Sequence, residues 1–148
     1  MIDMLSRKKV LLLVTLVVIL FLVYVGYYEL TKREEWTLEV YFNDKKVKEF
    51  SISWLKERCD EVKVNSFVYK GVSLEIILRA CKIESVKSFV AVGADGYHRE
   101  INGTYVSFAY VAVIPKEDVS SQGPLRLIVV GLSKKYWVKF LVRIEVKG

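Results

Sequence analysis

The sequence predicts an α+β protein in which an N-terminal transmembrane helix precedes a β-rich mixed domain. Two observations predict this division. Residues 10–28 form an uncharged apolar run of 19 residues, about the length that a helix needs to cross a bilayer. After residue 35, apolar and polar residues alternate over several segments, as they do in half-buried strands. We therefore expect a cytoplasmic stub and anchor helix at 1–28, a linker at 29–35 and a domain at 36–148.

The apolar run has the features of an uncleaved signal anchor. A basic cluster at 7–9 precedes it, as it would precede the core of a cleaved signal peptide. The run ends in the aromatic segment 24–28 and has no small-residue cleavage site, which favours the uncleaved anchor. Three basic residues before the run, against two at 32–33, predict a single pass through the cell membrane with the N-terminus in the cytoplasm and the domain outside.

The distribution of charged residues argues against nucleic acid as a partner. The formal net charge is +6, and the basic cluster at 7–9 supplies half of it. The other Lys and Arg residues are spread along the chain, without the basic face and stacking aromatics that nucleic-acid binding requires. We expect membrane lipid around Val10 to Tyr28, and another membrane or cell-surface protein as a partner of the domain. Asn102 begins an Asn-Gly-Thr sequon and is a glycosylation candidate.

Local patterns predict seven or eight strands and two short helices in the domain. The expected strands, in chain order, are 36–42, 47–50, 62–67, 86–92, 97–101, 105–114, 125–130 and 138–146. Ser51 or Ser53 can cap a first short helix. Ser73 begins a clearer helix at 74–82, whose apolar residues recur every three to four positions. Pro115 ends a strand, and 120–124 is expected to be a loop.

The turn at Gly93-Ala-Asp-Gly96 follows a buried strand and organises the chain. Its two glycines allow the backbone conformations that a tight turn needs. Asp95 can bond the local backbone, and Tyr97 can bury its ring while its hydroxyl stays paired. Both are interpreted as residues that lock the turn, with ligand contact as the second interpretation. His98 is expected to be a surface residue.

Three further residues leave alternatives open. Arg126 lies in an apolar strand, where it either holds an anion or, as we expect, pairs with Glu100 or Asp95. Cys59 and Cys81 either form a disulfide or stay unpaired, with Cys81 buried as a small apolar residue on its helix face. We favour unpaired cysteines. No catalytic residue and no metal-ligand cluster is predicted.

The segment from Trp36 to Val146 resembles the molybdopterin-binding domain of the sulfite oxidase family of oxidoreductases. Five motifs carry this resemblance, and in order they are Trp36-Thr-Leu-Glu-Val40, Tyr69-Lys-Gly-Val-Ser-Leu74 leading into a helix with Ile77-Leu78, Asp95-Gly-Tyr97, Gly123-Pro-Leu-Arg-Leu127, and Trp137-Val-Lys139 with Leu141 and Ile144. The resemblance implies an α+β fold with a mostly antiparallel sheet. It covers nearly the whole chain after the apolar run.

The resemblance also implies a molybdenum held by one cysteine thiolate and a pterin dithiolene. Cys59 lies ten residues before Tyr69, at a suitable distance for that ligand. However, the cysteine ligand of the family follows a strand. The position that follows the expected strand here is occupied by Asn65 or Ser66. No Arg/His cluster is set out for the pterin phosphate. The candidate cofactor-binding residues are therefore Cys59, Asp95, Tyr97 and Arg126, while the expected state is a domain without cofactor, molybdopterin being the alternative.

The function expected from these observations is that of a membrane-anchored extracytoplasmic module with a binding or structural role and no catalysis. One alternative is a molybdopterin-dependent oxidoreductase, or a redox accessory subunit, that uses Cys59. A second alternative is a pilin-like surface assembly subunit, because a long apolar N-terminal helix joined to a β domain is also that architecture.

Overall fold

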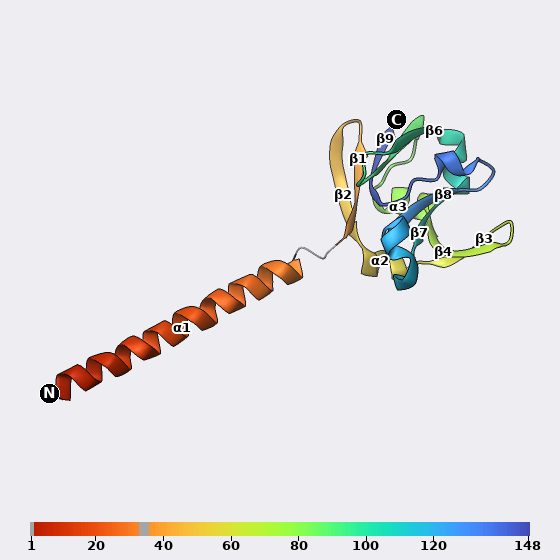
Figure 1. Cartoon of the computed structure of the whole chain (residues 1–148). Helices are drawn as coiled ribbons and strands as arrows, with labels where there is room; N and C mark the ends of the chain where they lie inside the picture. The colour runs from red at the N-terminus through yellow and green to blue at the C-terminus, as the bar shows by residue number, and fades with distance from the viewer. Residues whose placement is uncertain (1, 33–35) are drawn as a thin grey trace. The chain divides into compact units, whose positions relative to one another are not determined.

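The computed structural model describes residues 2–32 and 36–148, and the chain divides into two compact units between residues 35 and 36 (Figure 1). The first unit contains a single helix, α1 (Ile2–Lys32). This helix continues through the first part of the segment expected to be a linker. The rest of that segment, 33–35, lies outside the described residues.

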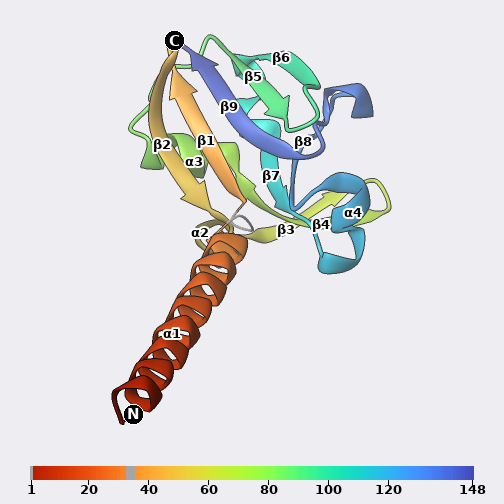
Figure 2. The same ribbon diagram turned by 60° about the vertical axis from the view of Figure 1, so that its left-hand side comes forward.

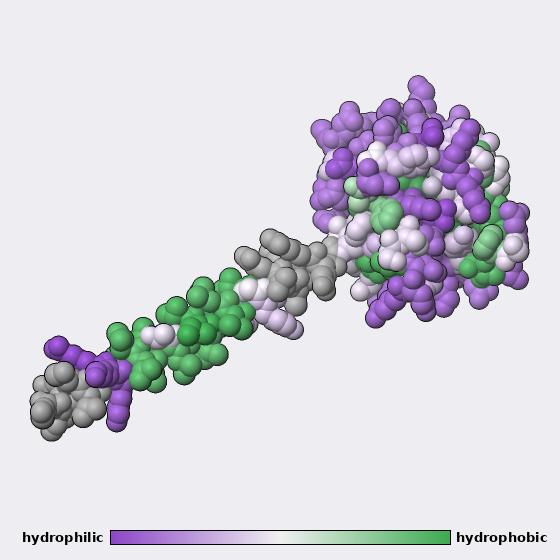
Figure 3. Space-filling view, in the orientation of Figure 1, coloured by the Kyte–Doolittle hydropathy of each residue, from purple (hydrophilic) through white to green (hydrophobic). Residues whose placement is uncertain are grey.

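The stretch Ser6–Tyr28 of α1 is long and apolar enough to cross a membrane, and it is the one such helix in the described part of the chain. Its 23 residues correspond to about 35 Å of helix, against about 30 Å of bilayer hydrocarbon. None of the apolar window is buried within the chain. Figure 3 shows its residues as a continuous hydrophobic band after the basic residues near the N-terminus.

The second unit contains two sheets (Figures 1 and 2). The first sheet has the order β2-β1-β9-β5-β6, and its strands are β1 (Thr37–Phe42), β2 (Lys45–Ser51), β5 (Ser88–Gly93), β6 (His98–Asn102) and β9 (Leu141–Lys147). The second has the order β3-β4-β7-β8, and its strands are β3 (Asp60–Val64), β4 (Phe67–Ser73), β7 (Ala109–Val113) and β8 (Leu125–Val129). Neighbouring strands are antiparallel except for β1 and β9, which are parallel. The unit is therefore α+β with a mostly antiparallel framework.

Short helices connect the strands. They are α2 (Ile52–Glu57), α3 (Leu74–Ala80), α4 (Val119–Gln122) and the 3₁₀ turns η1 (Gly103–Phe108), η2 (Lys116–Asp118) and η3 (Lys134–Tyr136). Ser51, and not Ser53, caps α2, because its hydroxyl accepts the N–H of Trp54 at 3.2 Å. Ser73 caps α3 through the N–H of Glu75. The core joins both sheets to α3 and includes the fully buried Leu38, Ile77, Phe89 and Leu127.

Three expected segments fold differently from the prediction. The expected strand 62–67 is a hairpin, because Asn65 adopts a φ of 56° and turns the chain between β3 and β4. The expected strand 105–114 begins as η1, which Asn102 caps by accepting the N–H of Thr104. The expected loop 120–124 includes the single turn of α4. In the first two cases a polar side chain or a local backbone conformation competes with the strand ladder.

The last strand is also shorter than its alternation predicts. It begins at Leu141 because Phe140 has a φ of 54°, which a strand does not accommodate. The Phe140 N–H donates to Gln122 O and its carbonyl accepts from Ala94 N, both at 2.8 Å. The residue thus joins the turn after β5 to the end of α4, and the chain before it leaves the first sheet.

Candidate functional site

The fold brings together three of the four predicted binding residues and separates the fourth. Asp95, Tyr97 and Arg126 line one pocket of about 450 Å³. Cys59 lines a second pocket of about 520 Å³. We call these the Arg126 pocket and the Cys59 pocket. The other residues around the Arg126 pocket are Lys134, Lys135, Trp137 and Lys139.

Arg126 is a buried cation without a carboxylate partner. It lies on β8 and is only 8% exposed. Its Nη1 donates to Gln122 Oε1 at 2.8 Å, and its guanidinium lies 5.4 Å from the centre of the Trp137 ring. Its Nε has no hydrogen-bond partner, and no carboxylate oxygen of the described chain comes within ion-pair distance. Burial lowers the pKa of Arg126, but a guanidinium remains charged at neutral pH.

The expected ion pair between Arg126 and Glu100 or Asp95 is therefore wrong. Glu100 lies on β6, where it pairs with Lys147 at 3.7 Å and accepts from Ser88. Asp95 accepts the backbone N–H of Tyr97 at 3.1 Å, which satisfies the turn. Local partners hold both carboxylates, and neither of them neutralises Arg126.

Three lysines surround the same pocket, which corrects the expectation of dispersed basic residues. They come from η3 and the segment after it, and that segment runs beside β8 because the Leu127 N–H donates to Val138 O at 2.8 Å. Lys134 lies over the rings of Phe67 and Trp137, at 5.0 and 6.0 Å from their centres. The pocket therefore combines four basic side chains with one acidic side chain.

Tyr97 connects the two sides of this pocket. Its hydroxyl donates to the carbonyl of Lys135 and accepts the Nε–H of Arg99 at 2.8 Å. The bond to Lys135 ties the turn between β5 and β6 to η3. Tyr97 and Asp95 thus form part of the pocket wall. His98 is exposed, with Nδ1 3.1 Å from the carbonyl of Gly96.

Cys59 occupies a different environment, between α2 and β3. Its Sγ donates to the carbonyl of Leu55 at 3.1 Å, and burial is the main cause that raises the pKa of the thiol. Asp60 raises this pKa further, and nearby lysines oppose the shift. Tyr69, in the wall of the Cys59 pocket, packs edge-on against Trp137 of the Arg126 pocket. Both cysteines are free and Cys81 is buried, as expected.

These residues do not fit a molybdenum centre. The metal requires a soft ligand such as a thiolate, but Cys59 donates its Sγ–H to the Leu55 carbonyl and lines a different pocket from the other candidate residues. The alternative ligand slot, Asn65 and Ser66, is the exposed turn of the β3–β4 hairpin and supplies no soft ligand. No group of three or more His, Cys, Asp or Glu side chains suited to a metal occurs among the described residues. The Arg126 pocket, by contrast, is lined by four basic side chains.

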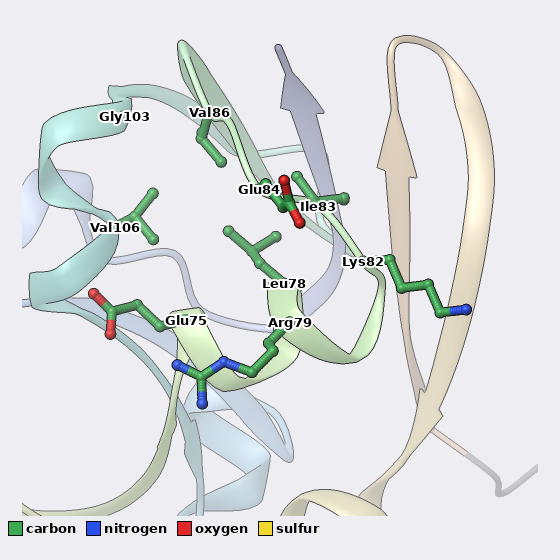
Figure 4. Close-up of a pocket in the computed structure, with 9 residues that line it drawn as sticks. All are labelled: Glu75, Leu78, Arg79, Lys82, Ile83, Glu84, Val86, Gly103 and Val106. Atoms are coloured by element: carbon green, nitrogen blue, oxygen red, sulfur yellow. The ribbon is translucent and has the colours of Figure 1, made fainter.

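Another cavity, of about 870 Å³, lies between α3 and η1 (Figure 4). None of the predicted site residues lines it. Its charged residues are all exposed and balanced in sign, being Glu75, Glu84, Arg79 and Lys82. In Figure 4 the Lys82 side chain extends away from the other three. The cavity therefore has neither a buried polar group nor a net charge to favour a particular ligand.

Comparisons with known proteins identify a structure with a related fold. No family model matches the chain, and no curated protein matches it. The domain is similar in structure to the sulfane dehydrogenase SoxCD from Paracoccus pantotrophus. The TM-score is 0.58 at 18% sequence identity, over 76% of this chain and 38% of that chain. The chain thus spans well under half the length of this neighbour, and the likeness shows a related fold alone.

The thiol of Cys59 is expected to react slowly at neutral pH. A raised pKa means that less thiolate is present at any given pH than in an unstructured cysteine peptide, and only the thiolate is nucleophilic. In a Cys81→Ser variant, the iodoacetamide rate should therefore keep rising with pH beyond the point at which the peptide rate levels off. Mass spectrometry of the alkylated protein measures this profile. A Cys59 that reaches its full rate below pH 8 would contradict the assignment and revive the metal-ligand alternative.

Proposed function

We propose that this protein is a membrane-anchored, extracytoplasmic binding module that holds an anionic ligand in the Arg126 pocket and catalyses no reaction. The observation that carries the proposal is the buried Arg126 guanidinium, which lacks a carboxylate partner and keeps a free Nε–H. A buried charge is costly unless it is paired. A bound anion would supply the missing partner.

The chemistry of the pocket favours an oxyanion. The planar guanidinium can donate two parallel hydrogen bonds to phosphate or carboxylate oxygens. Lys134, Lys135 and Lys139 add positive charge around it, and lysines attract anions even without direct contact. Trp137 also lines the pocket, and its ring lies under the Arg126 guanidinium and helps to fix it in place.

The evidence for membrane anchoring comes from α1. Its apolar stretch has the length of a bilayer core, and its side chains are not buried in the chain. The Tyr24 and Tyr28 rings stack at 6.5 Å near the C-terminal end of that stretch, where aromatic residues favour the membrane–water interface. The basic cluster at 7–9 supports a cytoplasmic N-terminus and an outward-facing domain.

The related fold of SoxCD, together with the five sequence motifs, supports a small domain of the molybdopterin-binding oxidoreductase type. The separation of Cys59 from the Arg126 pocket argues against the oxidoreductase alternative. Molybdenum in the purified protein, lost on Cys59→Ser, would establish that alternative instead.

A titration tests the binding proposal. The full chain in detergent is unfolded thermally with increasing inorganic phosphate or pyrophosphate, at constant ionic strength maintained with chloride. A specific site should raise the Tm saturably, because a ligand at 100 times its Kd stabilises by about 2.7 kcal/mol. Lys139→Ala should weaken the phosphate affinity about fivefold, because one exposed positive charge is removed from the pocket wall and an exposed charge pair contributes up to about 1 kcal/mol.

Lys87→Ala is the matched control. Lys87 is exposed, like Lys139, and lines neither pocket, so its removal should leave the affinity unchanged. A Tm that follows total salt and not phosphate, or equal effects of the two alanine variants, would show that the Arg126 pocket binds no oxyanion.

A further inference from the structure

The β3–β4 hairpin leaves one sheet edge open. β3 (Asp60–Val64) is the first strand of its sheet and pairs with β4 on one side only. Figure 1 shows the hairpin extending from the rest of the domain. The outer edge of such a strand presents unpaired N–H and C=O groups that can pair with another strand. Phe67 and Val68, at the start of β4, are 51% and 59% exposed, which places two large apolar side chains beside this edge.

The turn geometry determines which backbone groups face outward. Asn65 and Ser66 form a two-residue turn, so Val64 and Phe67 make the hydrogen-bonded pair that closes the hairpin. Hydrogen-bonded and non-hydrogen-bonded pairs alternate along an antiparallel ladder. Val62 opposite Tyr69 is therefore also hydrogen-bonded within the hairpin. The backbone groups of Glu61 and Lys63 must point away from β4, toward the open edge.

The charges along this edge are self-complementary. Glu61 and Lys63 are exposed, two positions apart and on one face of the strand. Neither takes part in an ion pair or side-chain hydrogen bond with any described residue. If a second β3 pairs antiparallel about Val62, each Glu61 lies opposite the Lys63 of the other copy. The same register makes Glu61 and Lys63 the hydrogen-bonded pair, which matches the direction of their backbone groups.

The geometry points to a homodimer in which β3 of one chain pairs antiparallel with β3 of a second copy, joining two four-stranded sheets into one. Shifting the register by two residues in either direction places Glu61 opposite Glu61 or Lys63 opposite Lys63. Like charges directly opposite each other destabilise a strand pair, and opposite charges stabilise it. The charge pattern therefore selects one register.

The edge of β2 does not offer the same match. It carries Lys45, Lys46 and Lys48, and Lys46 is already paired with Glu39 and Glu49. A second copy at that edge would meet an excess of positive charge. The β3 interface also involves none of the residues around the Arg126 pocket. A test of the dimer is therefore independent of a test of the proposed anion binding.

Charge reversal tests the dimer in the full chain. Sedimentation equilibrium in density-matched detergent should give a dimer for the wild type. Glu61→Lys and Lys63→Glu should each weaken it about tenfold or more, because two opposite-charge pairs become two like-charge pairs. The double variant E61K/K63E restores both pairs and should bring the dissociation constant back to within about threefold. Lys87→Glu changes the net charge as Lys63→Glu does, and should have no effect.

Cysteine cross-linking tests the register. In a Cys59→Ser background, chains with Glu61→Cys should form a disulfide with chains carrying Lys63→Cys, whereas neither variant should cross-link with itself. A monomeric wild type would overturn the proposal. A dimer that is insensitive to both single reversals, or that the double variant does not restore, would equally overturn it and indicate association through another surface such as α1.

Discussion

Replacing Arg126 with methionine is expected to stabilise the domain in buffer without phosphate and to leave it less stable than the wild type in buffer with saturating phosphate. Without phosphate, the free energy of unfolding should rise by about 1–2 kcal/mol, because a buried charge that lacks a carboxylate is replaced by an apolar side chain of similar length. With saturating phosphate, the order should reverse, because the wild type is stabilised by its bound ligand and the variant is not. A stabilising effect without phosphate and a destabilising effect with phosphate are expected together only if the guanidinium binds a ligand.

Urea denaturation of the full chain in detergent measures both free energies. Arg126→Lys is the informative comparison, since it keeps the charge and loses the planar pair of donors. We expect it to retain a weakened phosphate response. A methionine variant that is clearly less stable without phosphate would show that the contacts of Arg126 with Gln122 and Trp137 are structural. An unchanged phosphate response would remove the pocket from the proposed function.

Gly103→Ala should destabilise the domain by about 3 kcal/mol, at the upper end of the usual cost of overpacking. An ideal Cβ on Gly103 would lie 2.1 Å from the carbonyl oxygen of Val86 and 2.8 Å from its carbonyl carbon. These are backbone atoms, so no rotation of a side chain can relieve the contact. Gly103 N also donates to Lys87 O at 2.9 Å, which keeps the two segments close together.

Gly131→Ala is the control for the loss of glycine itself. Gly131 has a φ of 96°, and nothing lies within 4 Å of the added Cβ. Its substitution should cost about 1 kcal/mol through backbone strain alone. Thermal and urea unfolding of both variants provide the comparison. If Gly103→Ala were no worse than Gly131→Ala, the segment at Val86 would have to be free to move away, and the close approach would have no energetic role.

Some of the candidate site followed from the sequence. Asp95 and Tyr97 stand out beside two glycines in a turn, and Arg126 stands out as a charge within an apolar strand. The three lysines gave no such signal. They lie within six residues of one another at 134–139, but their direction depends on the hydrogen bond between Leu127 and Val138, which no local pattern encodes. The one clue was a lysine-rich segment that begins a few residues after a strand containing an arginine.

The strand boundaries show a similar division. Alternation from Val138 to Val146 predicts one long strand, but the left-handed backbone at Phe140 ends it early. The bonds from Phe140 to Gln122 and Ala94 are what favour that conformation. The hairpin turn at Asn65-Ser66 could be recognised, because Asn tolerates a positive φ. The apolar residues on both sides nevertheless favoured a single continuous strand.

The sequence by itself determined the apolar helix, the α+β class and most of the elements, because hydrophobic periodicity and helix caps act over a few neighbouring residues. Only the tertiary structure decided that Arg126 has no carboxylate partner, that Cys59 lies in a separate pocket, and that the edge of β3 is open. Each of these features depends on contacts between segments that are distant in the sequence. Such contacts decide which side chains are buried and which groups are paired, and no local sequence pattern encodes them.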